Sequence, residues 1–185
     1  TATVVREDKF LKNPKLKKQK AIAIGLYRGL SQGNLKASDI FDIEKTGKYL
    51  AFISFFNAAH ALGSGNLHLY FNPNTYKFEP IVMELDLYQT HRRRKRISHL
   101  GEYNYQIFTE YFALVVDDPK IRASFKKHKI NLYNYVIENI NELKKQEKKH
   151  LEILRTEFSL LPKINWDSLL AENKDKLELI KQDRF

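Results

Sequence analysis

The 185-residue sequence contains no cysteine, so disulfides and thiolate-bound metal ions are excluded. Long hydrophobic runs are also missing. The longest one is far shorter than the roughly 20 apolar residues that cross a bilayer, and we expect no membrane span. Acidic residues are scarce, because 22 Asp and Glu stand against 32 Lys and Arg and give a net charge of +10. This excess favours contact with anions, whether nucleic acid, acidic protein, lipid headgroups or a nucleotide.

Ligand-binding motifs are few. The sequence has neither a Walker-type loop nor a GxGxxG segment, and Gly63-Ser64-Gly65 alone is a weak signal. Several histidines are scattered among cations, namely His91, His99, His128 and His150. This scatter disfavours a zinc site. The chain begins at Thr1 without a signal-peptide pattern, so we expect a native N-terminal part to be missing, and the compartment stays open.

The stretch that begins at Lys48 predicts an apolar helix around which the domain is organised. Side chains that recur at steps of three and four are Tyr49, Phe52, Ile53, Phe56 and His60. Other apolar residues fill most of the remaining circumference, which is typical of a helix inside a domain. We expect Ser38 or Asp42 to cap its start, and Gly63 with Gly65 to end it.

A β-hairpin is predicted next. Leu67, Leu69 and Phe71 alternate with polar or aromatic residues, the segment 72–75 (Asn-Pro-Asn-Thr) suits a type I turn, and a second strand follows over 76–83. Residues 42–86 therefore combine the central helix with a hairpin. Since other segments have helical patterns, the predicted fold class is α+β and mainly helical, in a single domain spanning 1–185.

The remaining segments flank this centre. Residues 1–20 are basic, contain Pro14 and show little periodicity, so we expect an exposed connecting segment. A short helix is predicted over 21–30. Residues 104–185 predict a helical tail, with helices over 105–116, from Pro119, over 130–158 and over 166–180. Asp118 is the expected cap before Pro119, Asp167 the possible cap of the last helix, and Trp166 its expected anchor.

The order of residues after the central helix resembles a known family. Asn66, Leu67-His68-Leu69-Tyr70, Asn72-Pro73, Lys77-Phe78-Glu79-Pro80-Ile81 and then acids are similar to a segment of the bacterial spore-coat-protein-H (CotH) kinase-like family. Asp118-Pro119 and the stretch 166–170 resemble the family's helical tail more loosely. The resemblance implies the C-terminal, lobe-like part of an atypical protein kinase, a protein substrate, and magnesium with ATP. It also implies a bacterial source and a spore-coat or exported location.

The resemblance also implies site residues. Asn66 would hold the nucleotide's metal ion, together with Glu84 or Asp86, between which one sequence does not decide. The position of the expected aspartate base is Ala61, which leaves His60 as the nearby group able to accept a proton. Simpler interpretations remain open: Asn66 as a turn residue, both acids as solvated strand residues, and His60 as a core histidine. Whether the protein is an enzyme therefore stays open, and a catalytically inactive binding module of the same fold is the alternative.

A second alternative depends on the unbroken row Arg92-Arg93-Arg94-Lys95-Arg96. Such a row could grip the phosphates of RNA or an acidic protein, or it could be a solvated loop. No aromatic residue interleaves it, so a platform for base stacking is missing. Nucleic-acid binding is accordingly the weaker hypothesis.

Overall fold

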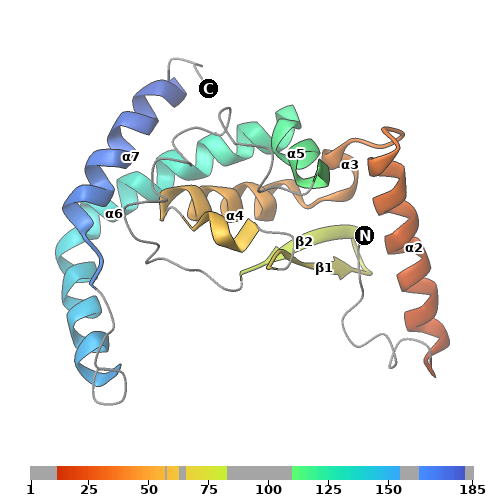
Figure 1. Ribbon diagram of the computed structural model, residues 1–185, viewed down its shortest axis with the longest axis horizontal. Helices are drawn as coiled ribbons and strands as arrows, with labels where there is room; N and C mark the ends of the chain where they lie inside the picture. Colours follow the sequence, from red (N-terminus) through yellow and green to blue (C-terminus); the bar gives the residue numbers. More distant parts are fainter. Residues whose placement is uncertain (1–11, 57, 63–65, 83–109, 155–162, 182–185) are drawn as a thin grey trace.

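A computed structural model describes residues 12–56, 58–62, 66–82, 110–154 and 163–181 (Figure 1). Its elements in chain order are α2 (Pro14–Ser31), α3 (Ala37–Ile40), α4 (Ile43–Phe55), the 3-10 helix η1 (Ala59–Leu62), β1 (His68–Asn72), β2 (Lys77–Ile81), α5 (Glu110–Asp117), α6 (Pro119–Leu154) and α7 (Trp166–Lys181). The two strands form one antiparallel sheet. The predicted class, mainly helical α+β with a hairpin, is confirmed for the described residues.

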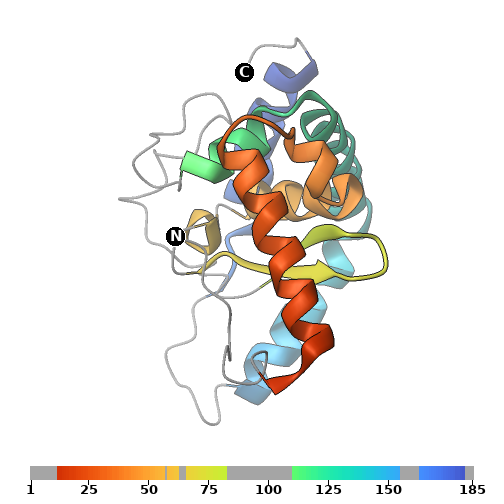
Figure 2. The same cartoon turned by 90° about the vertical axis from the view of Figure 1, so that its right-hand side faces the viewer.

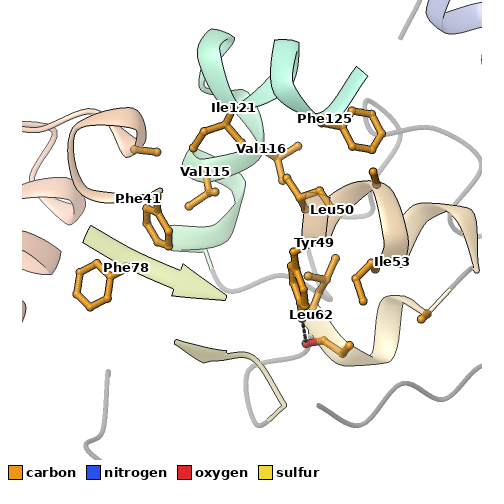
Figure 3. Packing of buried hydrophobic residues seen from close by; sticks show 14 of the residues in the cluster. Phe41, Tyr49, Leu50, Ile53, Leu62, Phe78, Val115, Val116, Ile121 and Phe125 are labelled. Carbon is orange, nitrogen blue, oxygen red and sulfur yellow. Dashed lines mark hydrogen bonds between the residues drawn. The ribbon is translucent and has the colours of Figure 1, made fainter. Parts of the chain in front are cut away.

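Helix α4 lies at the centre and packs along α6 (Figure 1). Its buried residues are Thr46, Gly47, Tyr49, Leu50, Ala51, Ile53, Ser54 and Phe55. The sequence prediction of an enclosed helix is confirmed, and so is the cap, because Asp42 Oδ1 accepts from the backbone N–H of Lys45 at 2.9 Å. Figure 3 shows Leu50 of α4 beside Val116 of α5, and Tyr49 of α4 beside Leu62 of η1.

The end of α4 differs from the prediction. The helix stops at Phe55 instead of continuing towards Gly63, and a separate 3-10 helix follows. The N–H of Ala58 donates back to the carbonyl of Ile53 at 2.9 Å, a bond that closes a helix C-terminus. Asn173 of α7 donates to the carbonyl of Phe55 at 2.9 Å. Because part of this termination comes from a distant helix, the local sequence carried no signal for it.

The hairpin packs against the start of α4. Its register pairs Phe71 with Phe78, and the aromatic rings of this pair lie 5.4 Å apart. Phe78 also contacts the ring of Phe41 at 5.6 Å, and its carbonyl accepts from Asp42 N at 2.9 Å. The strands of the predicted hairpin are thus confirmed over 68–72 and 77–81, and the apolar face of the sheet completes the core.

Helix α2 begins earlier than expected. Asn13 caps it, since its Oδ1 accepts from the N–H groups of Lys15 and Leu16 at 3.0 and 3.3 Å. Pro14 takes the first helical position, where its missing N–H costs nothing. Residues 14–20, expected as part of an exposed connecting segment, are therefore the first turns of a helix, while residues 1–11 lie outside the described part. The helix ends at Ser31, one residue beyond the predicted end at residue 30, and Gly33 after it adopts φ +73°.

In the helical tail, α6 and α7 begin at the predicted residues, Pro119 and Trp166. Asp118 Oδ1 accepts from Lys120 N at 2.9 Å and from Ile121 N at 3.4 Å, which caps α6. α6 then continues for 36 residues to Leu154 as one helix. At α7 the cap is Asn165, whose Oδ1 accepts from Ser168 N at 3.0 Å. The prediction of Asp167 as cap is wrong, since its carboxylate pairs with Lys144 at 3.0 Å.

Figure 2 shows α2 crossing the outside of the molecule in front of the hairpin. On its inner side Leu30 is buried, and Ala23, Leu26 and Tyr27 pack against the same core. None of the described helices is long and apolar enough to span a bilayer.

Candidate functional site

Asn66 lies directly before β1 and is half-buried. The register pairs His68 with Ile81, so the chain enters β1 and leaves β2 at the same end of the hairpin. Glu84 and Asp86 follow Ile81 in the sequence, and both lie outside the described residues. Asn66 is therefore the one predicted metal ligand among the described residues. For the two acids, the structure describes only strand β2, which precedes them in the sequence.

His60 belongs to η1, although its side chain lies outside the described part. The rest of this short helix is firmly held. The hydroxyl of Tyr49 donates to the carbonyl of Ala61 at 3.1 Å, which is the dashed contact in Figure 3. Burial raises the pKa of Tyr49 to about 12, so this hydroxyl keeps its proton as a donor. The backbone that carries His60 is thereby fastened to the central helix.

Position 61 itself is part of the core. Ala61 has 0% exposure and Leu62 beside it has 1%. A carboxylate in place of this methyl group would be removed from water without a charged partner, which costs several kcal/mol. The aspartate base that the resemblance implies at position 61 is therefore incompatible with this packing.

A polar network holds the outer face of the hairpin. Glu79 accepts from Lys45 Nζ at 2.7 Å and from Asn72 Nδ2 at 2.8 Å. These two hydrogen bonds lower the pKa of Glu79. The network ties both strands to the first turn of α4, close to where the chain passes from α3. The alternation of residues along the strand indicated that Glu79 points away from the core. Nothing in the local sequence indicated that Lys45 of α4 would be its partner.

A buried lysine between α4 and α6 was not predicted. Lys129 is 2% exposed, and its Nζ donates to Ser54 Oγ at 2.6 Å. Burial, and then the nearby charge of Lys176, lower the pKa of Lys129 to about 7. Lys129 falls four residues after Phe125 and eight after Ile121, which are buried apolar residues of the same face. This spacing was the available signal, and the charged residue type obscured it.

The described residues contain no cluster of three or more His, Asp or Glu side chains that could hold a metal ion. The amide oxygen of Asn66 is a suitable ligand type for magnesium, which prefers oxygen atoms. A single amide does not make a site, so a magnesium site here depends on the acids that follow β2.

The row 92–96 lies outside the described residues, and so do His91 and His99. For the predicted site, the structure therefore describes the position of Asn66, the backbone of η1 and the end of β2. No protein-family model, curated protein or solved structure matches this chain.

Proposed function

We propose that this chain forms the C-terminal, lobe-like part of a CotH-like atypical kinase that transfers a phosphoryl group from ATP to a protein. One observation supports the proposal above the others. The antiparallel register brings the entry to β1, where Asn66 lies, to the same end of the hairpin as the exit from β2. The acids Glu84 and Asp86 follow that exit in sequence.

Phosphoryl transfer requires mainly positioning and charge neutralisation. When bound, magnesium would supply charge neutralisation at the phosphate oxygens. The amide oxygen of Asn66 and a carboxylate of Glu84 or Asp86 are the chain's ligands for it. Asn66 precedes β1 and the two acids follow β2 in the sequence, and the register brings these two points of the chain to the same end of the hairpin.

The proton of the attacking hydroxyl needs an acceptor. His60 is the proposed one, because an imidazole has an ordinary pKa near 6.5 and is largely neutral at pH 7. The hydrogen bond from Tyr49 to the Ala61 carbonyl, at 3.1 Å, anchors the segment that carries it. Tyr49 would thus act on the position of this segment and would not touch the substrate.

A second function is favoured by a different observation. Ala61 has 0% exposure and occupies the position at which the resemblance implies an aspartate. If His60 does not replace that base, the chain would be a nucleotide-binding or structural module without phosphotransfer activity.

One experiment separates the two functions. The full-length protein would be incubated with magnesium and ATP labelled in the γ-phosphate, with thermal melting recorded in parallel. We expect label on protein, which is lost in Asn66→Ala and in at least one of Glu84→Gln and Asp86→Asn. The control is Asp117→Asn, an exposed carboxylate in α5 with a side chain 57% accessible, which should leave the transfer unchanged.

The outcomes are distinct. Thermal stabilisation by magnesium and ATP without any transfer would favour the inactive module. The kinase proposal fails if the protein shows neither stabilisation nor transfer. His60→Gln tests the base: it should remove transfer while leaving nucleotide-dependent stabilisation intact.

A further inference from the structure

Helix α2 is charged with one sign only. Its charged residues are Lys15, Lys17, Lys18, Lys20 and Arg28, and it contains no Asp or Glu. α6, the other long basic helix, is different, because acids alternate with its lysines. Lys145 lies 4.0 Å from Glu142, and Lys148 lies 3.9 Å from Glu152. The positive charge of α6 is therefore partly neutralised within the helix, and that of α2 is not.

The cations of α2 occupy the surface that its packing leaves open. Its apolar stripe is used by the core, through Leu30, Ala23, Leu26 and Tyr27. The opposite stripe is exposed and consists of Lys17, Lys18, Ala21, Gly25 and Arg28. A Cβ added at Gly25 would meet nothing within 4 Å. Figure 2 shows α2 at the front of the molecule.

The electrostatic arrangement within α2 is unfavourable by itself. The N-terminal end of a helix carries a partial positive charge, which favours acids and disfavours lysines. α2 has no acid in its first turn, and Lys15, Lys17 and Lys18 lie in its first two turns. Over the part of the chain that the structure describes, no carboxylate pairs with these three side chains. An external anion would offset this accumulation of charge.

We propose that the outward stripe of α2 with Lys17, Lys18 and Arg28, together with exposed Lys15 at the start of the helix, binds the phosphate backbone of a nucleic acid. The rise of an α-helix puts Lys17 and Arg28 roughly 16 Å apart along the axis. One strand of DNA presents a phosphate about every 3.4 Å, so the surface spans about five phosphates. Ala21 and Gly25 lie between the cations, and their small size lets a backbone approach the helix closely.

The same surface fits other anionic partners less well. A membrane-binding helix inserts its apolar face between lipids, but the apolar face of α2 is already packed on the core. An acidic protein partner would need apolar anchors at the centre of the interface, and the exposed stripe offers alanine and glycine there. Charge alone suffices for nonspecific binding of nucleic acid. No exposed aromatic residue of α2 is available to stack on bases, so the binding would be independent of sequence.

The test uses fluorescence anisotropy of the full chain with a labelled 20-base-pair duplex of mixed sequence and with the matching single strand. The test variant is Lys15→Gln with Lys17→Gln and Lys18→Gln. The control is Lys145→Gln with Lys148→Gln and Lys149→Gln, which removes the same charge from exposed positions of α6. We expect the test variant to weaken binding at least tenfold and to reduce the salt slope by about two to three counterions. The control should weaken binding much less.

Further variants and probes make every outcome decisive. Replacing the same three α2 lysines by arginine should retain binding, and Arg28→Gln alone should weaken it. Equal loss in the α2 variant and the α6 control would overturn the proposal, since only overall charge would then matter. Absence of binding at low salt would also overturn it. So would an α2-dependent affinity for phosphatidylserine vesicles that exceeds the affinity for both nucleic acids.

Discussion

The amine of Lys129 lies 2.6 Å from the hydroxyl oxygen of Ser54, with both side chains buried between α4 and α6. The charges that act on the pKa of Lys129 belong to α7, where Lys176 pairs with Glu172 at 2.9 Å. Glu172 is thus already bonded to another cation, and Lys129 has to keep its proton largely without a carboxylate. Burial, and then the charge of Lys176, therefore lower the pKa of Lys129 to about 7.

This lysine predicts how stability changes with pH. In the unfolded chain its pKa is the ordinary 10.5, against about 7 in the folded protein. Between these two values the unfolded chain binds more protons at this site, so its contribution to stability rises with pH across this window. Below about pH 7 both states are protonated and the cost of burying the charge is fully present.

Lys129→Met isolates this contribution. We expect the variant to be more stable than the wild type near pH 6, and its advantage to shrink as pH rises to about 9, because the wild-type lysine becomes neutral. Urea unfolding at several pH values measures the difference. Lys127→Met removes a charge whose side chain is 58% exposed, and its profile should run parallel to the wild type. A constant offset for Lys129→Met would contradict the prediction.

The contact between α4 and α6 predicts a severe effect at Gly47. A Cβ atom there would lie 2.3 Å from Ser124 Oγ and 2.8 Å from the backbone carbonyl carbon of Ser124. Gly47→Ala should therefore lower the free energy of unfolding by about 1 to 3 kcal/mol through overpacking. Gly25→Ala is the matched control: it meets nothing within 4 Å and should stabilise the helix by about 0.5 to 1 kcal/mol. If both variants lose similar stability, the packing explanation is wrong.

The carboxylate of Asp118 caps α6 and also bonds to α3, so we expect its removal to lower the stability of the protein strongly. It accepts from Lys120 N at 2.9 Å within α6 and from Ser38 N at 2.8 Å across to α3. Asp118→Ala should cost about 2 to 3 kcal/mol, since it removes a cap and leaves a buried N–H unpaired. Asp117→Ala, which removes the neighbouring exposed carboxylate, should change stability by less than about 0.5 kcal/mol. Chemical denaturation of the two variants compares them directly.

The pH dependence of that cap has the same sign as that of Lys129 but lies in the acidic range, because both groups have a lower pKa in the folded protein than in the unfolded chain. Burial raises the pKa of Asp118, but the hydrogen bonds from Ser38, Lys120 and Ile121 outweigh it and lower the pKa overall. The contribution of Asp118 is therefore present above its unfolded pKa and is lost as pH falls through the folded value. The stability difference between the wild type and Asp118→Asn should narrow in acid.

Trp166 supplies a local probe for α7. Its Nε1 donates to Glu147 Oε2 at 2.6 Å, and the backbone N–H of Ile164 donates to Glu147 Oε1 at 2.6 Å. Glu147→Ala should cost about 2 kcal/mol, because both donors lose a charged acceptor. Since the chain has one tryptophan, its emission should shift to longer wavelength as the indole meets water. Glu152→Ala, with a side chain 67% exposed, should leave the spectrum unchanged.

Elements with strong local signals were predictable from the sequence. Asp118 followed by Pro119 marked the start of α6, alternation marked the hairpin, and Trp166 was recognised as an anchor. The mainly helical α+β class followed from these patterns. Each of these signals acts within a few residues, through caps, turns and periodicity, which a sequence displays directly.

The candidate site was predictable only in part. The sequence order Asn66, hairpin, acids is a local pattern, and the hairpin register places Asn66 at the end from which the acids follow. The roles of His60, Glu84 and Asp86 stay predictions. The loss of a base at position 61 was visible in the sequence, but the burial of Ala61 was not, because it depends on the packing of Tyr49 against η1.

Tertiary structure alone decided where α4 ends and which cation lies in the core. The sequence continues its apolar pattern beyond Phe55, yet α7 supplies Asn173 to bond the Phe55 carbonyl at 2.9 Å. Lysine is usually a surface residue, but the long side chain of Lys129 reaches Ser54 across the interface between α6 and α4. Residue type and spacing set local conformation, whereas burial depends on which distant surfaces exclude water, and that follows only from the assembled helices.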